Sequence, residues 1–171
     1  MDYRMLRKWS DLKGTAVVTL DDGKKVGTLD DFYFDPQTNT APGFLVKTGL
    51  FGHKALKTNT IHAFGQDAVT ATNEDALIAE KDDAQLAALP HGSDLLSYKV
   101  MSQSGTVIGT INNLLLDLNT PGTVSVGAFE MKGDLLERIG HRQPTFEASK
   151  VTRYGHDVIV VPDALAVELS Q

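Results

Sequence analysis

An internal repeat constrains this sequence more than any other feature. Residues 23–35 align with residues 105–117 without a gap, and the alignment matches two glycines, the threonine after the second glycine and the final aspartate. Two further blocks match in the same order, residues 10–12 with 93–95 and residues 61–69 with 151–159. Because a repeat sets the architecture of a whole chain, three ordered matches predict two diverged copies of one unit.

Each copy carries the signals of antiparallel strands. In the first copy, residues 15–20 are rich in β-branched side chains, and Asp21-Asp22-Gly23 has the composition of a hairpin turn. Turns rich in Thr, Asn, Pro and Gly separate the later strands. The strands expected are residues 15–20, 26–34, 43–47 and 68–72 in the first copy, and residues 98–102, 107–116, 124–132 and 158–161 in the second.

Two glycines lie inside expected strands, Gly27 in the first copy and Gly109 in the second. A glycine in a strand usually marks a bulge, a sharp bend or a close approach of another backbone. These features are typical of a small and strongly curved sheet, and about five short strands per copy is typical of a barrel.

The segment between the copies has a different composition. Residues 73–89 are rich in alanine, leucine and acidic residues, Asn73 is suited to cap a helix and Pro90 to stop it. We therefore expect a mainly β protein made of two small antiparallel β-barrels in tandem, joined by a short helical linker. The expected bounds are residues 1–72 for the first barrel, 73–92 for the linker and 93–171 for the second barrel.

The composition excludes several classes of function. The chain has no cysteine, so disulfides, thiolate catalysis and cysteine-based zinc sites are excluded. Its net charge is -6, and neither half carries the basic stripe of a nucleic-acid-binding protein, which leaves nucleic acid as a partner only through a ribosomal protein. There is no signal-peptide-like stretch and no run near the roughly 18 apolar residues that span a bilayer, so a cytoplasmic location is expected.

No motif of a catalytic, metal or cofactor site is present in the sequence. The five histidines show no HExxH spacing, and neither a phosphate-binding glycine loop nor a GxSxG nucleophile motif occurs. The acidic pairs Asp21-Asp22 and Asp30-Asp31 lack the pattern of a calcium loop, and neighbours in a strand point to opposite faces. We interpret them as turn and rim acids, and expect no catalytic residue, metal or cofactor.

The repeated residues resemble those of the PRC-barrel family. The resemblance is carried by Leu12-Lys13-Gly14, residues 25–35 and residues 61–69, and in the second copy by Ser104-Gly105, residues 107–109, Asn112-Asn113 and Asp117. Members are found in the cytoplasmic part of the photosynthetic reaction-centre H subunit and in the C-terminal half of bacterial ribosome-maturation factors. The resemblance implies two PRC-like barrels that act in docking or assembly, without catalytic residues common to the family.

The loops after the third strand of each copy are the candidate binding sites. In the first copy, Leu50 and Phe51 stand between two glycines at a hairpin tip, where an apolar pair either folds back over a barrel mouth, the favoured interpretation, or is offered to a partner. In the second copy this loop is longer, and its apolar residues share one face at helical spacing, so that it either binds a partner, caps the second barrel or packs on the first. The candidate partner-binding residues are Leu50, Phe51, His53, Leu135, Leu136, Ile139 and Arg142.

From these observations we expect a non-catalytic protein-interaction or assembly module of the PRC-barrel type, with a protein partner that the sequence does not identify. One alternative is a ribosome-linked or RNA-linked assembly factor, by resemblance to the maturation factors. A second alternative is a small-ligand-binding protein or a hydrolase that uses a cleft between the barrels. Self-association is also open, because barrel tips and short sheet edges can pair about a two-fold axis.

Overall fold

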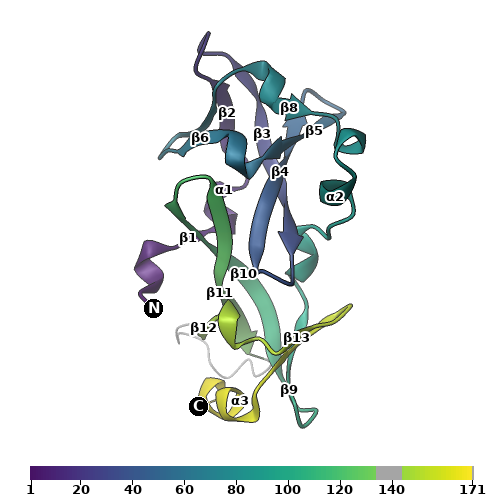
Figure 1. The fold of residues 1–171 in the computed structure, drawn as a ribbon. Helices are drawn as coiled ribbons and strands as arrows, with labels where there is room; N and C mark the ends of the chain where they lie inside the picture. Colours follow the sequence, from purple (N-terminus) through teal and green to yellow (C-terminus); the bar gives the residue numbers. More distant parts are fainter. Residues whose placement is uncertain (134–143, 171) are drawn as a thin grey trace.

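The computed structural model of the protein describes residues 1–133 and 144–170. Within these residues the chain is mainly β, and its strands form one continuous sheet, which Figure 1 shows extending along the whole ribbon. We call residues 1–89 the first half and residues 90–170 the second half. The sheet order is β13-β14-β9-β10-β11-β4-β3-β2-β7-β6, with β1 on β10, β12 on β11 and β5 on both β4 and β8.

The eight strands that the hydrophobic and turn patterns predicted are present, and the described residues form six further strands beside them. The first half contains β1 (Arg7–Lys8), β2 (Ala16–Thr19), β3 (Lys25–Asp35), β4 (Thr40–Thr48), β5 (Gly52–Lys57), β6 (Ile61–Phe64), β7 (Ala68–Ala71) and β8 (Leu77–Ile78). The second half contains β9 (Lys99–Ser102), β10 (Val107–Thr120), β11 (Thr123–Gly133), β12 (Thr145–Glu147), β13 (Arg153–Tyr154) and β14 (Val158–Val161).

Short helices connect the strands. The α-helices are α1 (Trp9–Leu12), α2 (Ala84–Ala87) and α3 (Asp163–Leu169). The described 3₁₀ helices are η1 (Tyr3–Met5), η2 (Thr58–Thr60), η3 (Glu74–Ala76), η4 (Glu80–Asp82), η5 (Gly92–Leu95) and η7 (Ala148–Lys150). None of the described helices is long and apolar enough to cross a membrane.

The strands of the second half pair in the same order as those of the first. β2 lies between the antiparallel β3 and the parallel β7, and β9 lies in the same way between β10 and β14. Val17 is opposite Gly27 and Val69, as Val100 is opposite Gly109 and Ile159. The repeated sequence blocks therefore occupy equivalent positions in the sheet.

Both strand glycines have the role that their position in the strand predicted. The register shifts between Val17 and Val18 opposite Gly27, and the corresponding shift lies between Val107 and Gly109. A Cβ on Gly27 would lie 2.5 Å from the carbonyl oxygen of Lys47, and a Cβ on Gly109 would lie 2.6 Å from that of Lys132. Bulge and close backbone approach are thus confirmed together.

The expected closure into two separate barrels is not observed among the described strands, because the sheet is open. The central strands are longer than their sequence pattern predicted: β10 continues past residue 116 to Thr120, and β4 already begins at Thr40. These extensions bring Thr40 opposite Ser125, so that β4 pairs with β11 and joins the two halves in one sheet.

The expected helix over residues 73–89 is wrong. The segment consists of η3, β8, η4 and α2, and only four of its residues are α-helical. Leu77 and Ile78 pair with β5 instead, and Leu77 is 7% exposed. Helix propensity is a weak preference that a free strand edge and a core position override. The Asp83 carboxylate then starts α2 by accepting a hydrogen bond from the Leu86 backbone N–H, 3.0 Å away.

The segments that lead into the two halves cross over. β1, which precedes the first half, pairs with β10 of the second half through Arg7 opposite Leu116. Pro90, which begins the second half, accepts a hydrogen bond from the Phe34 backbone N–H of β3, 2.8 Å away. His91 also bridges to Tyr33 of β3. Each half is therefore held by the entry segment of the other.

The aromatic core lies at this crossing. The ring of Phe32 meets the Trp9 ring edge-on at a centroid distance of 5.1 Å, and both side chains are buried. Phe44 completes this part of the core, 6.3 Å from the Phe32 ring. On its other side the Phe32 ring lies against Gly92 of η5, where an added Cβ would be 2.1 Å from the nearest ring atom. Trp9 and Gly92 are equivalent positions of the repeat, so a large and a small residue share the space around Phe32.

This packing predicts that Gly92→Ala is strongly destabilising. Overpacking of a filled core costs about 1–3 kcal/mol, and the nearest atoms here belong to a buried ring. We expect a loss of about 2 kcal/mol or more in the free energy of unfolding, measured by urea titration. In a Phe32→Leu background the same change should cost clearly less, because the ring is gone. Additive effects of the two substitutions would contradict this account of the crossing.

Candidate functional site

The tip of the β4–β5 hairpin carries the most exposed apolar residues of the described chain. Leu50 is 83% exposed and Phe51 95% exposed. Thr48 and Gly52 pair directly, so only three residues form the loop. Gly49 takes a φ of +73°, and a Cβ on Gly52 would lie 2.6 Å from the Thr48 carbonyl oxygen. The favoured expectation that the pair folds back is therefore wrong, because so short a turn holds both side chains away from the sheet.

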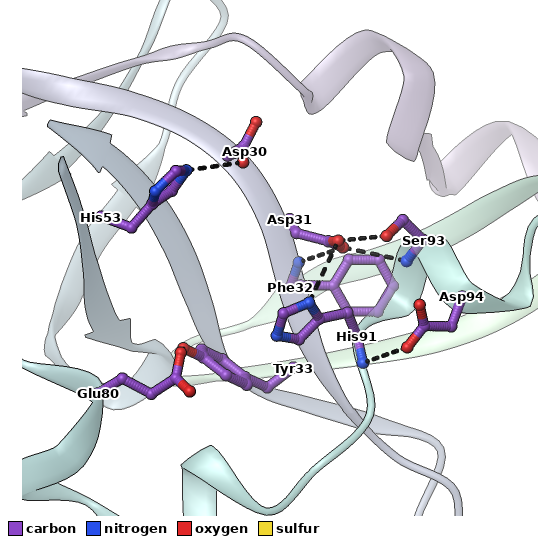
Figure 2. Close-up of polar contacts among 9 residues, drawn as sticks. All are labelled: Asp30, Asp31, Phe32, Tyr33, His53, Glu80, His91, Ser93 and Asp94. Atoms are coloured by element: carbon purple, nitrogen blue, oxygen red, sulfur yellow. Dashed lines mark hydrogen bonds and ion pairs between the residues drawn. The ribbon is translucent and has the colours of Figure 1, made fainter. Parts of the chain in front are cut away.

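His53 lies directly beside this tip. It is opposite Lys47 in the hairpin, and its Nε2 is 3.1 Å from Oδ2 of Asp30 on β3 (Figure 2). The register of β3 against β4 passes from Leu29 to Asp31, so Asp30 bulges out toward the histidine. Both side chains are more than one-third exposed, and such a pair contributes little to stability. Together they place polar groups next to the apolar tip.

The other candidate residues belong to the longer loop of the second half. Leu135, Leu136, Ile139 and Arg142 lie outside the described residues. Their role in binding, or in capping the second half, stays a prediction.

Asp31 is the polar residue whose role the sequence analysis missed. It is 7% exposed, so its interpretation as a rim acid is wrong, whereas Asp22 does belong to a turn, where it accepts a hydrogen bond from Thr19 Oγ1. Oδ1 of Asp31 accepts hydrogen bonds from the backbone N–H of Phe32, at 2.8 Å, and of Ser93, at 3.0 Å. Oδ2 accepts one from the Ser93 hydroxyl (Figure 2). A strand residue of the first half thus fixes the entry segment of the second.

The equivalent position of the second half repeats this arrangement with an amide. Oδ1 of Asn113 accepts hydrogen bonds from the backbone N–H of Leu114, at 2.9 Å, and of Ser10, at 3.4 Å. Nδ2 of Asn113 donates to the Ser10 hydroxyl at 2.8 Å. The sequence repeat already aligned these residues with Asp31 and Ser93, but an alignment cannot show that each serine binds the opposite half.

A second polar group surrounds Tyr33 at the same crossing. Its hydroxyl donates to Oε2 of Glu80 at 2.7 Å, and the His91 ring packs edge-on against its ring at 5.3 Å (Figure 2). Burial and the Glu80 carboxylate raise the pKa of Tyr33 above its ordinary range. The phenol is therefore held as a neutral donor, which suits a structural contact.

Sites that could serve chemistry are the remaining question for the described residues. They contain no cluster of three or more histidine or acidic side chains able to hold a metal ion. A cavity of about 230 Å³ lies between the two halves, bounded by the start of β4, η2 and the β10–β11 turn. None of the residues that line it has an ionisable side chain, as the list shows: Thr40, Ala41, Pro42, Thr58, Asn59, Gly122, Thr123 and Val124.

The two equivalent crossings predict how Asp31 tolerates substitution. Asp31→Ala leaves two backbone N–H groups without their acceptor, so we expect a loss of about 1–3 kcal/mol in unfolding free energy. Asp31→Asn reproduces the chemistry found at Asn113 and should cost less than about 1 kcal/mol. Asp30→Ala is the matched control. Asp30 is the partly exposed neighbour of Asp31, and its replacement should change the unfolding free energy by no more than about 0.5 kcal/mol. Equal losses for the alanine and asparagine variants would refute this role.

Buried tyrosines predict the response to alkali. Burial raises the pKa of Tyr154, whose hydroxyl donates to Oδ1 of Asn39 across the two halves at 2.7 Å. A raised folded-state pKa contributes stability that is complete below the unfolded value of about 10 and is lost as the pH rises above it. Tyr154→Phe removes one such group. Its unfolding free energy, measured from pH 8 to 11, should therefore decline less steeply than that of the wild type, and parallel curves would contradict the assignment.

A search of curated proteins finds no match to this chain. A family model, that of the PRC-barrel domain, matches residues 6–78, which extend from β1 to β8. This range contains the first copy of the repeat, including the strand pair and the closing block that carried the resemblance. Residues 6–78 are therefore a PRC-barrel domain.

Proposed function

We propose that this protein is a non-catalytic protein-interaction module whose partner surface is the tip formed by Leu50 and Phe51. The observation that carries the proposal is the exposure of this pair, 83% and 95%, at the end of a hairpin. Exposed apolar residues that gather at one point of a surface mark interaction sites more often than single scattered ones do. A PRC-barrel scaffold used for docking or assembly agrees with this role.

The energetics favour such a tip as an anchor. Full burial of a leucine or phenylalanine side chain at an interface stabilises the complex by about 1.5–3 kcal/mol for each side chain. Gly52 to Lys57 pair with β4 at every position, so the backbone on which the three-residue tip is mounted is already ordered before a partner arrives. A preorganised anchor loses little conformational entropy on binding. Two apolar side chains on an ordered backbone can therefore supply much of the affinity of a moderate complex.

The surroundings of the tip indicate what the partner surface offers. Lys47 is exposed on β4 just below it and Lys54 on β5, whereas His53 between them is paired with Asp30. A partner with an apolar pocket and acidic groups at its rim would match this arrangement, because opposite charges at a rim steer association.

The second half completes the proposal. Its strands pair in the order seen in the PRC-barrel domain. We therefore also propose that residues 93–171 form a second PRC-like unit, with residues 1–72 as the first. A cytoplasmic location for both is part of this proposal. The repeated sequence blocks support this part.

Replacement of the tip tests the function. Leu50→Ser with Phe51→Ser should weaken partner binding about 100-fold or more, because about 3 kcal/mol of apolar burial is lost. The partner is identified by capture with the tagged full-length chain from a native extract, and its affinity for each variant is then measured by titration. Met5→Ser is the matched control, since Met5 is 61% exposed on η1, far from this hairpin.

The same experiment can refute the proposal. Both variants should unfold at the wild-type temperature, because the replaced side chains contact solvent. A partner that binds the double variant as tightly as the wild type, or the absence of any captured protein, would contradict an interaction role for the tip.

A further inference from the structure

The first half covers the outer edge of its β5 strand with a segment of its own chain. β8 pairs antiparallel with β5, placing Ile78 opposite Ala55 and Leu77 opposite Leu56. Ile78 packs with a small apolar cluster that includes Tyr33, whereas Leu77 belongs to the main core. Two adjacent aliphatic residues in an extended segment thus complete this side of the first half.

β12 is the equivalent of β5 in the second half. Phe146 lies opposite Phe129 of β11, as Leu56 lies opposite Phe44 of β4. Thr145 accordingly takes the place of Ala55. Among the residues that the structure describes, β12 pairs with β11 and with no other strand. The edge that β8 covers in the first half therefore has no described strand in the second.

The backbone of β12 is oriented to accept a further strand. The Met131 backbone N–H donates to the Pro144 carbonyl oxygen at 2.8 Å. In an antiparallel pair the hydrogen-bonding groups of successive residues alternate between the two sides of the strand. The backbone N–H and C=O of Thr145 consequently point away from β11, toward the edge that no described strand covers. They are the groups with which an added strand would pair.

A groove of about 750 Å³ lies beside this edge. Leu115, the equivalent of Tyr33, is among its lining residues, with Tyr3 and Thr145 around it. The charged groups at the rim are already paired, Lys8 with Glu130 at 3.3 Å and the Met1 amino group with Glu147 at 3.4 Å. Asp2, Arg4 and Asn112 also line the groove, so its surface is mixed and its paired charges attract no charged occupant. The aliphatic character of the occupant follows instead from β8 in the first half.

We propose that β12 and this groove bind an extended segment of a partner protein that carries two adjacent aliphatic residues. The segment adds to the sheet as an antiparallel strand, with backbone hydrogen bonds to Thr145 and one aliphatic side chain over Leu115. Addition of a strand to a sheet edge is a general mode of peptide recognition, in which the main chain supplies affinity and side-chain pockets supply specificity. The contact of β8 with β5 is the template for the geometry.

This surface is separate from the Leu50–Phe51 tip. β12 belongs to the second half, and Figure 1 shows it near the N-terminus, away from the hairpin of β4 and β5. Strand addition at β12 does not require the tip to function. The Leu50→Ser, Phe51→Ser variant should therefore bind a β12 ligand as the wild type does, and the two proposals can fail independently.

The test uses the full-length chain and a synthetic peptide with the sequence of residues 74–89, the segment that covers β5 in the first half. Titration of the labelled protein, followed by amide NMR, should give saturable shifts at Thr145, Phe146 and Leu115. A control peptide in which Leu77 and Ile78 are both replaced by aspartate should give none. Shifts confined to β5, which would mean that the peptide displaces β8, would overturn the proposal, as would no shift at all.

Two changes test the backbone pairing. Thr145→Pro removes the outward backbone N–H without removing a hydrogen bond to β11. It should lower the affinity for the peptide at least tenfold. A peptide methylated on the backbone nitrogen of Ile78 should be weakened to a similar degree on the unchanged protein, which guards against a folding defect in the proline variant. Retained affinity for the methylated peptide would refute strand addition. Sedimentation that shows two copies joined through β12 would also refute the proposal, because the edge would then serve self-association.

Discussion

Every part of this fold depends on the crossing of the two entry segments. A single buried polar side chain holds each of them: Asp31 binds Ser93 of the second half, and Asn113 binds Ser10 of the first. The aromatic core forms at the same place, where Phe32 packs between Trp9 and η5. Separating the halves would leave these polar groups without partners and expose the core at once, so we infer that the two halves fold as one cooperative unit.

The two copies of the repeat share the same strand pairing but differ in the residues that cover the core and the sheet edge. Both halves have a strand glycine next to a bulge, a parallel pair of short strands and a docked serine at equivalent positions. They differ where one copy must compensate for the other, as when the bulk of Trp9 is matched by the missing side chain of Gly92. They also differ in what covers the sheet edge, since β8 lies on β5 and β12 has no such strand among the described residues. Divergence has therefore produced unequal surfaces on equivalent strands.

The expected strands were predicted correctly because the sequence signals for a strand are local. Alternating burial, turn residues and the two strand glycines each depend on a few neighbouring positions, and β14 occupies residues 158–161 as expected. It missed features that depend on distant contacts. β8 forms where a helix was expected because the segment pairs with the edge of β5. Asp31 is buried under Ser93, which lies 62 positions away in the sequence. The exposure of Phe51 was missed for another reason, since composition cannot show how short a turn will be.

The polar side chains of the crossing are used by the structure itself. Among the described residues, no buried side-chain nitrogen or oxygen lacks a hydrogen-bond partner. Asp31 accepts three hydrogen bonds from Phe32 and Ser93, and Tyr33 and Glu80 bind each other. A group engaged in this way exchanges protons or ligands only if the crossing opens, which costs part of the stability of both halves. The free interaction capacity of the described chain lies instead at its surface, in an apolar tip of one half and an unpaired strand edge of the other.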